Sequence, residues 1–381
     1  MTTGSSSKRA STELSDFPTG DSVTLPNLPD EIIAEILPWL PVKSLLKFRC
    51  VSKSWRSLIS TTEFIKTHLK ISTKSNVGCH NRLLIGSGRP LPTNFHTFVL
   101  NPRIDDERNS LSDTLVLDYN SCDSIRIIGS CNGLVCVVLD DYTIVLWNPA
   151  TRKSKKLPFS YPDTLWSVYG FGYAESTDDY KVMEICSVCN HLDEYETRVN
   201  VYSWRRNSWR DMEWSGGAAV AAENNPGVFV NGAIHWLTCS DHWGLIVFDV
   251  ATGACSSVEL PRHRNEDVEH VMLGVVSGGG LLCASFDYGS YMDVWVMGEY
   301  GAQESWTKLA CLSYYLLLRR HRHLVRPKLL FVAENGGVLL SLGSDLILYK
   351  PPNSHEVYSI GSGAEVEGVT YSESLLSPEF G

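Results

Sequence analysis

The stretch LPDEIIAEILPWLPVKSLLKFRCVSKSWRSLI, residues 28–59, is the most informative part of this 381-residue chain. Its aliphatic residues recur at helical spacing, which places Ile32 and Ile36 on one face of a first helix. Pro38 is expected to end or kink this helix near Leu37, because proline lacks the backbone donor and clashes with the preceding turn. The pattern predicts a short and unusually apolar helix.

Two further short helices are predicted after the first. Residues 42–51 (VKSLLKFRCV) form the second, and Ser52 is placed to cap a third that runs through KSWRSLI. A segment of roughly 40 residues is too small to bury so many aliphatic side chains by itself. Part of its apolar surface therefore meets either a partner protein or the domain that follows, and periodicity alone leaves both a docking motif and a lid open.

The same stretch closely resembles the F-box, without gaps and with its helices in the same order. The residues that carry the match are Leu28-Pro29, Ile36-Leu37, Leu40-Pro41, Leu45, Arg49, Val51-Ser52-Lys53 and Trp55-Arg56. The resemblance implies binding to a Skp-type adaptor, which connects the chain to a cullin scaffold. It implies an adaptor contact and core set of Leu28, Pro29, Ile32, Ile36, Leu37, Leu40, Pro41, Leu45, Val51 and Trp55. The sequence leaves open which of these face the adaptor and which hold the helices together.

The composition indicates a globular, β-rich protein with more than one folded unit. Hydrophobic residues make up 43% of the chain, and its 11 Trp and 29 Gly favour strands joined by many turns. The net charge of −10 argues against a general nucleic-acid binder, and no apolar run is long enough to span a membrane. Basic residues gather at 43–74, which suits either an acidic protein partner or a solvated helix face.

The cysteines and the N-terminus predict a protein of the cytoplasm or nucleus. The 11 cysteines are scattered without disulfide spacing, and no secretory signal opens the chain. Both features favour a reducing compartment. Residues 1–24 are rich in Ser and Thr and predict a disordered tail. Residues 25–72 form the F-box and a bridging helix, and residues 80–377 form the β-rich domain.

An internal repeat runs through the β-rich domain. Its units are residues 131–158, 230–261, a degenerate 278–309, a looser 335–360 and a half-unit at 197–212. A full unit has an Asn-Gly or Gly-Gly turn, a strand, a loop with Asp, and a second strand that ends in an aromatic residue. Asn-Gly supplies the positive φ of a tight turn. A step of roughly 45 to 55 residues is typical of four-stranded blades in a kelch-type propeller, and six, seven or eight blades remain open.

This region also resembles the F-box-associated domain of plant F-box proteins, which is kelch-like and recruits substrates. The matching strings are GSCNGLVCV (129–137), LWNPATRKSKKLP (146–158), YGFGYAESTDDYKVMEI (169–185) and VTYSESLLSP (369–378). The predicted fold class is α+β, with a small N-terminal three-helix F-box followed by a mainly β, kelch-type β-propeller-like domain.

The two resemblances together imply the substrate-recognition subunit of an SCF ubiquitin ligase. The F-box would bind the Skp-type adaptor, and the β domain would recruit a protein substrate for ubiquitination and proteasomal degradation. Substrate contact is expected on loops at one end of the blades, with Ser187 to Glu196, Arg262 to His270 and Arg319 to Arg326 as candidates. The alternative is a kelch-type ligand-binding or enzymatic β-propeller with a helical N-terminal lid.

The sequence predicts no catalytic residue, no metal site, no cofactor, and neither nucleic acid nor a membrane as partner. Cys186 and Cys189 form a lone Cys-x-x-Cys pair in a predicted strand, where cysteine packs as a small hydrophobe. GSGAEVEG (361–368) lacks the Gly-Lys-Ser/Thr ending of a phosphate-binding loop, and we interpret it as a late turn. The chain is therefore predicted to be a non-catalytic receptor.

Overall fold

The computed structural model describes residues 29–74, 81–87, 94–99, 111–117, 124–160, 164–189, 195–214, 225–239, 243–261, 268–276, 280–313, 326–350, 354–359 and 366–379. The chain separates into two compact units, Met1–Leu37 and Pro38–Gly381. The predicted disordered tail, residues 1–24, lies outside the described residues.

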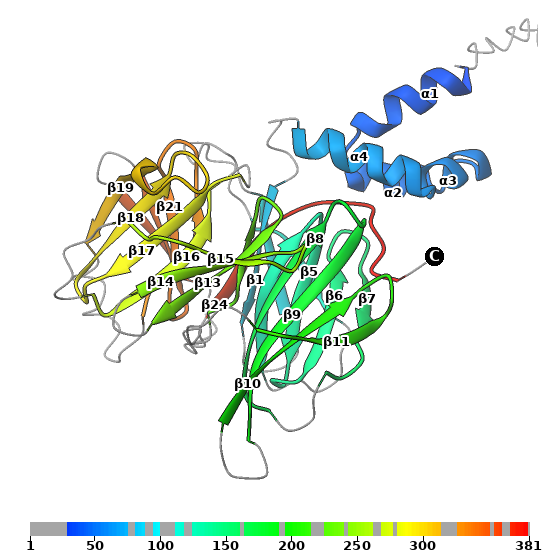
Figure 1. The fold of residues 1–381 in the computed structure, drawn as a ribbon. Coiled ribbons are helices and arrows are strands. Elements are labelled where there is room, and N and C mark those ends of the chain that lie inside the picture. The colour runs from blue at the N-terminus through cyan, green and yellow to red at the C-terminus, as the bar shows by residue number, and fades with distance from the viewer. Residues whose placement is uncertain are drawn as a thin grey trace, which may run out of the picture. The chain divides into compact units, whose positions relative to one another are not determined.

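The described N-terminal part is helical, as predicted (Figure 1). Its elements are α1 (Asp30–Ile36), the 3₁₀ helix η1 (Leu37–Trp39), α2 (Val42–Phe48), α3 (Lys53–Ile59) and α4 (Thr62–Lys74). Helix α1 gives way to 3₁₀ geometry at the residue before Pro38, which confirms the expected end. The Ser52 side chain caps α3 by accepting a 3.1 Å hydrogen bond from the Trp55 backbone N–H.

Helix α2 is shorter than predicted. The predicted helix extended to residue 51, whereas α2 ends at Phe48. The following residues tighten into a turn in which the N–H of Val51 donates to the carbonyl of Phe48. Ser52 is extended, with φ −150° and ψ 160°. The chain must leave the α conformation before this capping residue, since a cap has non-helical geometry.

The rest of the described chain forms six four-stranded antiparallel sheets, or blades. Blade 1 runs β24 (Val366–Ser372), β1 (Asn81–Ser87), β2 (Asn94–Val99) and β3 (Leu111–Val116). Blade 2 runs β4 (Ile125–Cys131), β5 (Leu134–Leu139), β6 (Thr143–Asn148) and β7 (Lys153–Lys156). Blade 3 runs β8 (Thr164–Ala174), β9 (Asp179–Cys189), β10 (Tyr195–Ser203) and β11 (Ser208–Met212).

The other three blades follow in chain order. Blade 4 runs β12 (Val228–Val230), β13 (Ala233–Cys239), β14 (Trp243–Asp249) and β15 (Cys255–Val258). Blade 5 runs β16 (His270–Val275), β17 (Leu282–Asp287), β18 (Tyr291–Met297) and β19 (Trp306–Ser313), with the 3₁₀ helix η2 (Gln303–Ser305) before β19. Blade 6 runs β20 (Lys328–Val332), β21 (Val338–Leu342), β22 (Asp345–Lys350) and β23 (Ser354–Ser359).

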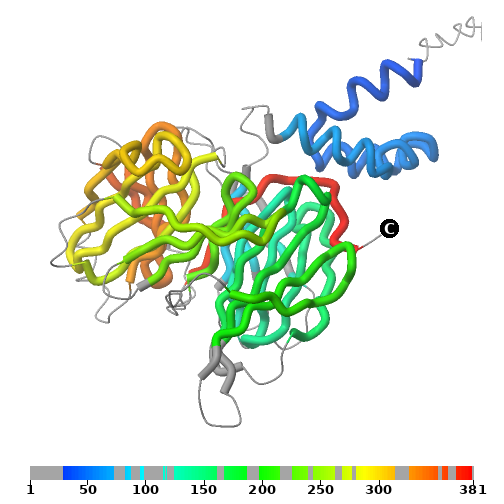
Figure 2. The backbone as a smooth tube through the Cα atoms, in the orientation of Figure 1, coloured from blue at the N-terminus to red at the C-terminus, as the bar shows by residue number. Residues whose placement is uncertain are grey.

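The first strand named in each blade is the innermost, and these six strands contact one another in a closed ring. The ring is completed by the C-terminal strand β24, which pairs with β1 from the N-terminal side of the domain; Figure 2 shows the red tube of β24 beside the cyan tube of β1. The structure therefore confirms a β-propeller and resolves its blade number as six.

Apolar packing between neighbouring blades holds the ring together. Six hydrophobic clusters of described residues each join two adjacent blades. Trp147 of blade 2, for example, is 1% exposed and lies 5.0 Å from the ring of Phe95 in blade 1. The aromatic residue that ends the second strand of the repeat thus fills a seam between blades, since a lone sheet could not bury it.

The sequence repeat corresponds to the three outer strands of a blade. Units 131–158, 230–261 and 335–360 contain these strands in blades 2, 4 and 6. Unit 278–309 contains the first two outer strands of blade 5 and the first half of β19. The predicted Asn-Gly turns lead into them, with φ 53° at Asn132 and 82° at Gly133. One interpretation was wrong: Val366 to Gly368, expected in a late turn, begin the closing strand β24. Their β conformation is imposed by pairing with β1, which lies far away in sequence.

The propeller has two different ends. The innermost strands run in the same direction, as the parallel bridges Gly170↔Gly227 and Val276↔Val332 show. We call the end at which they begin the loop end, and the end at which they finish the tail end. The described part of each candidate substrate segment, at Ser187, at His270 and at Arg326, belongs to the loop end. Residues 190–194, 262–267 and 319–325 of those segments lie outside the described residues.

The tail end is covered by the residues that follow β24. Arg82 and Glu373 form an ion pair of 2.5 Å whose side chains are 9% and 6% exposed. The Asn148 side-chain amide donates to the carbonyls of Ser374 (3.0 Å) and Leu376 (2.7 Å). The Trp204 indole N–H donates to the carbonyl of Pro378 at 2.8 Å. The C-terminal residues therefore fasten blades 1, 2 and 3 together at this end.

Candidate functional sites

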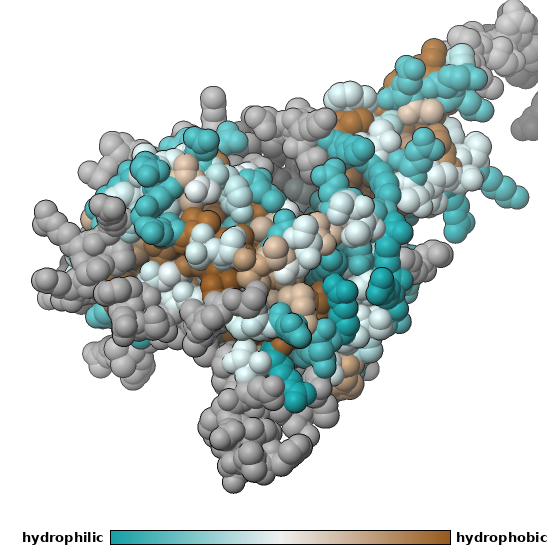
Figure 3. Space-filling model, in the orientation of Figure 1, coloured by the Kyte–Doolittle hydropathy of each residue, from teal (hydrophilic) through white to brown (hydrophobic). Residues whose placement is uncertain are grey.

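The helical segment carries an exposed apolar surface. Ile32 and Ile36 lie one turn apart on α1 and are both exposed, Ile36 to 48%. Trp39 in η1 is 66% exposed, and Val51 is also exposed. Exposed apolar side chains of this size are typical of a surface that another protein covers. Figure 3 shows brown apolar residues interleaved with teal polar ones on the helical segment.

The structure divides the residues that the F-box resemblance proposed as contact and core. Leu37 and Leu45 are buried, at 2% and 0% exposure, whereas Pro29, Ile32, Ile36, Pro41 and Val51 are exposed. Leu40 and Trp55 are half-buried, and Leu28 lies outside the described residues. The sequence analysis did not select Trp39, although an aromatic residue between two prolines is a recognisable signal.

Helix α4 is tied to its neighbours through its apolar face and one charge. Phe64 and His68 are buried, and the His68 Nε2 lies 3.0 Å from the carbonyl oxygen of Leu40. On its exposed side, Lys66 donates to the Asp178 carboxylate at 2.7 Å. The predicted bridging helix is therefore present, and its lysine contacts the tail end of blade 3.

The central axis of the propeller holds a cavity of about 220 Å³. Its walls come from all six innermost strands and from Asn225, Pro226 and Gly227, which precede β12. At Gly227 a Cβ atom would lie 2.4 Å from Trp236 Cε2, so only glycine lets the wall pass this close to the indole. The charged residues that line the cavity are Arg126, Lys328 and Glu367.

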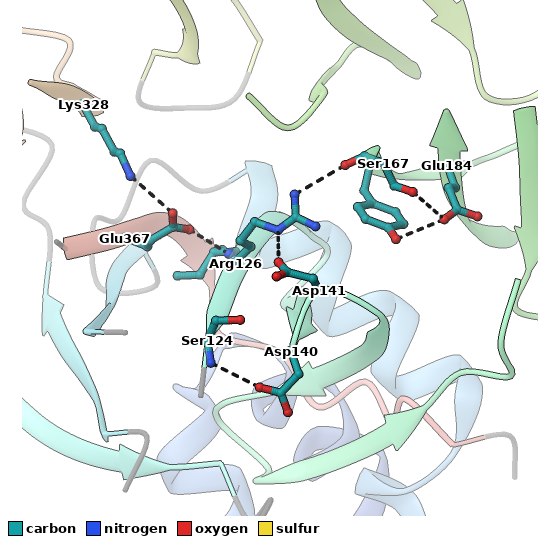
Figure 4. Close-up of polar contacts among 10 residues, drawn as sticks. Ser124, Arg126, Asp140, Asp141, Ser167, Glu184, Lys328 and Glu367 are labelled. Atoms are coloured by element: carbon teal, nitrogen blue, oxygen red, sulfur yellow. Dashed lines mark hydrogen bonds and ion pairs between the residues drawn. The ribbon is translucent and has the colours of Figure 1, made fainter. Parts of the chain in front are cut away.

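These three charged residues all lie near the loop end of the cavity, because each stands at or near the start of its innermost strand. Glu367 accepts a 2.9 Å hydrogen bond from the Ile127 backbone N–H and faces Lys328 Nζ at 3.4 Å (Figure 4). Both oxygens of Glu367 are thus engaged. Further from the loop end the lining residues are mostly apolar, such as Ile128 and Leu330, although Ser130 and Thr370 also line the cavity, where the Ser130 hydroxyl donates to the Thr370 carbonyl. The cavity therefore has a charged mouth and a mainly apolar depth.

Arg126 is held loosely. Figure 4 shows its guanidinium between Ser167 and Asp141, 3.4 Å from the Ser167 carbonyl and 3.5 Å from the Asp141 carboxylate. Both distances exceed those of ordinary N–H···O hydrogen bonds. The Nε atom is buried without a hydrogen bond, while the guanidinium also lies 5.7 Å from the centre of the Tyr169 ring. Arg126 therefore retains unused donor capacity.

A second carboxylate beside the cavity is fully engaged. Glu184 is 1% exposed and accepts from Ser167 Oγ (3.1 Å), Tyr169 OH (3.0 Å) and Asn200 Nδ2 (3.2 Å). Burial, followed by the charge of Glu184, raises the pKa of Tyr169, so the phenol stays protonated and donates. Glu184 thus fixes the wall that carries Tyr169 and does not line the cavity itself.

Exposed aromatic side chains gather at the loop end. Tyr142 and Phe159 are each 60% exposed, and their rings stack at 6.1 Å. Lys156 lies 5.4 Å above the Phe159 ring. Tyr291 of blade 5 and Tyr358 of blade 6 are also exposed at this end. Aromatic residues are enriched at protein interfaces, so these residues form a candidate second docking surface.

Metal chemistry receives no support from the described residues. No group of three or more His, Cys, Asp or Glu side chains there could hold a metal ion. Cys186 lies inside β9, and burial raises the pKa of its thiol to about 12, which disfavours the reactive thiolate. Within the described ranges, no helix is long and apolar enough to cross a membrane.

Comparison with known proteins matches both parts of the chain. The F-box domain matches residues 25–67, and the F-box associated beta propeller domain matches residues 93–374. An F-box/kelch-repeat protein of Arabidopsis thaliana is 32% identical over 371 residues, covering 92% of this chain and 96% of the relative. The Arabidopsis thaliana F-box protein CPR1 is 27% identical, covering 84% and 81% of the two chains. This chain therefore belongs to the plant F-box proteins that carry an F-box associated β-propeller domain.

Proposed function

We propose that this chain is the substrate-recognition subunit of an SCF ubiquitin ligase. Its F-box binds a Skp-type adaptor, and its propeller holds a protein substrate for ubiquitination and proteasomal degradation. The observation that carries the proposal is the set of exposed apolar residues within the matched F-box, Ile32, Ile36, Trp39 and Val51. Water-exposed side chains of this kind weaken solubility unless a partner covers them.

In this proposal the two ends of the propeller have separate roles. The aromatic residues Tyr142 and Phe159 belong to the loop end, where substrate would bind. The F-box helix α4 contacts the tail end through Lys66 and Asp178. In the proposed role the chain itself supplies no reacting group. It acts by holding substrate near the ligase, which raises the effective concentration of the substrate lysine.

The proposed site of action is a reducing compartment, the cytoplasm or the nucleus. The seven cysteines whose side chains are described are all free thiols, and Cys131, Cys136, Cys186 and Cys283 are buried. Buried free cysteines suit a protein that does not meet an oxidising environment. Imaging of the tagged chain in plant cells tests this, and a secretory-pathway location would contradict it.

Adaptor binding can be tested by co-purification of a Skp-type adaptor with the full chain. Serine substitutions at Ile36 and Trp39 should each weaken binding by about 1 to 3 kcal/mol, because each removes an apolar contact. Their effect on unfolding should be small, since both side chains are exposed. Leu309→Ser is the matched control, because Leu309 is an exposed aliphatic residue on the propeller.

A substitution at a buried F-box residue distinguishes a loss of folding stability from a loss of adaptor contact. Leu45→Ala should lower the free energy of unfolding by about 2 to 5 kcal/mol, since Leu45 is 0% exposed. If the Ile36→Ser, Trp39→Ser double variant keeps its fold and also retains the adaptor at wild-type strength, the proposal fails. Equal loss of adaptor in the Leu309→Ser control would also contradict it, because the effect would then not belong to the F-box.

A further inference from the structure

The cavity on the propeller axis contains two buried nitrogen donors that lack a hydrogen bond. One is Arg126 Nε and the other is Asn225 Nδ2. Among the described residues that line the cavity, no side-chain acceptor is buried and unpaired in the same way. A buried donor without a hydrogen bond is unfavourable, so a ligand rich in acceptors would satisfy both atoms.

The charges at the mouth point to an anion. Among the described lining residues, the cations Arg126 and Lys328 outnumber the single anion Glu367. Glu367 faces Lys328, whereas the described polar contacts of Arg126 are the two long ones to Ser167 and Asp141. Asp141 is a weak competitor, because its side chain is 75% exposed and is hydrated. One surplus cation with a planar fork of N–H donors fits a single carboxylate.

The inner part of the cavity restricts which kind of molecule can carry the carboxylate. Beyond the charged mouth most of the lining residues are apolar, including Ile128, Phe171, Phe229 and Leu330. Ser130 and Thr370 also line this part, and the Ser130 hydroxyl is already engaged with the Thr370 carbonyl. The volume of about 220 Å³ accommodates a branched aliphatic group and no large ligand. An inorganic anion would leave this apolar surface uncovered, so a phosphate ion fits the site poorly.

We propose that the cavity binds a carboxylate attached to a short apolar body, with the carboxylate at Arg126 and Asn225 and the apolar body deeper along the axis. Two sources share this chemistry. One is a small aliphatic carboxylic acid, and the other is the C-terminal residue of a polypeptide that enters from the loop end. The polypeptide source rests on the proposed function as a substrate receptor, whereas binding of the small acid does not.

Ligand-observed NMR on the purified full chain tests the proposal with defined probes. These are 4-methylpentanoate, the peptide acetyl-Gly-Ser-Gly-Leu with a free C-terminus, the same peptide with a C-terminal amide, and inorganic phosphate. The acid or the free-terminus peptide, or both, should bind at millimolar concentrations or below. The amide and phosphate should bind at least tenfold more weakly, because they lack either the charge or the apolar body.

Variants assign the binding to the cavity. Arg126→Met should lower affinity at least tenfold, and Arg126→Lys should lower it less, because lysine keeps the charge but loses the planar fork. Asn225→Ala should lower affinity severalfold. Arg206→Met is the matched control, since it removes an exposed arginine at the tail end and should leave affinity unchanged. Thermal unfolding of each variant confirms that it is folded before titration.

Each outcome decides the inference. Binding of the acid alone identifies a small-molecule site, and binding of the free-terminus peptide identifies a site for a polypeptide C-terminus. Absence of binding by both probes overturns the proposal, and so does equal binding of the amide or of phosphate. Wild-type affinity in folded Arg126→Met and Arg126→Lys also overturns it. Adaptor co-purification is measured separately. A negative result for the cavity therefore does not contradict the proposed receptor function, which has its own test.

Discussion

The two ends of the propeller differ in what their polar and aromatic side chains do. At the tail end, charged and hydrogen-bonding groups are paired with the C-terminal residues, as in the buried ion pair of Arg82 and Glu373. At the loop end, Arg126 keeps unused donors, and Tyr142 and Phe159 face solvent. The difference indicates that the tail end serves closure of the ring, whereas the loop end is available for binding. Substitutions at the two ends should therefore have different consequences.

The largest expected effect is at the tail-end ion pair. Glu373→Leu removes the Glu373 carboxylate from the buried Arg82 guanidinium and should lower the free energy of unfolding by about 3 to 5 kcal/mol. The double variant Arg82→Met, Glu373→Leu should regain most of this loss, because it removes both charges. Urea unfolding of the two variants provides the measurement. Equal destabilisation of the single and double variants would show that the charge pair is not the cause.

A buried histidine makes stability depend on pH. Burial lowers the pKa of His235 to about 4, and its ring nitrogens lie 3.0 Å from the Val228 carbonyl and 2.8 Å from Tyr300 OH. The unfolded chain binds this proton near pH 6.5, so stability is lost as pH falls from about 6.5 to 4, by up to about 3 kcal/mol. His235→Gln should lose less stability than wild type across this window. Parallel unfolding curves at pH 7 and pH 4.5 give the comparison, and identical losses would exclude His235.

A smaller effect is expected at Asp178, where blade 3 meets α4. Burial alone would raise the pKa of this carboxyl, but hydrogen bonds from Lys66, Tyr173 and Arg205 outweigh burial and lower the pKa to about 2. The lowered pKa stabilises the fold above about pH 4, and this stabilisation is lost as pH falls towards 2. Asp178→Asn should cost about 1 kcal/mol at pH 7, because these side chains are partly exposed. A cost that does not shrink in acid would argue against the charge as its origin.

The smallest effect on stability is expected at the loop-end aromatic residues. Tyr142→Ser and Phe159→Ser should change the free energy of unfolding by about 0.5 kcal/mol or less, since both rings are exposed. The double variant should nevertheless lose co-purifying substrate proteins at least tenfold while the adaptor signal stays unchanged, as measured by quantitative mass spectrometry against wild type and Leu309→Ser. Unchanged substrate recovery would move the docking surface away from this aromatic pair.

Local patterns in the sequence predicted the elements that local physics controls. The cap at Ser52, the end of α1 before Pro38 and the Asn132-Gly133 turn each depend on a few neighbouring residues. The innermost strands were harder to recognise. Strand β12 has only three residues, and β24 begins in a glycine-rich run that resembles a turn. Such strands are fixed by pairing across the ring, which no short window of sequence contains.

The candidate sites also differ in whether the sequence could predict them. The exposed residues Ile32 and Ile36 lie within a contiguous motif, so the sequence could select them. Arg126, Lys328 and Glu367 come from three separate blades, and each is unremarkable in its own segment. Their convergence on the cavity mouth required the folded ring.

The sequence by itself determined the F-box helices, the blade repeat and the membership in the plant F-box proteins, because these follow from local periodicity, turn chemistry and contiguous motifs. Only the tertiary structure decided the six-blade closure by β24, the burial of Leu37 beside an exposed Ile36, and the charged mouth of the axial cavity. The ring closure and the cavity mouth arise from contacts between residues far apart in the sequence, such as Ile127 and Glu367, which are 240 positions apart. Closure of the ring brings such residues into contact, and their spacing in the sequence does not predict this contact.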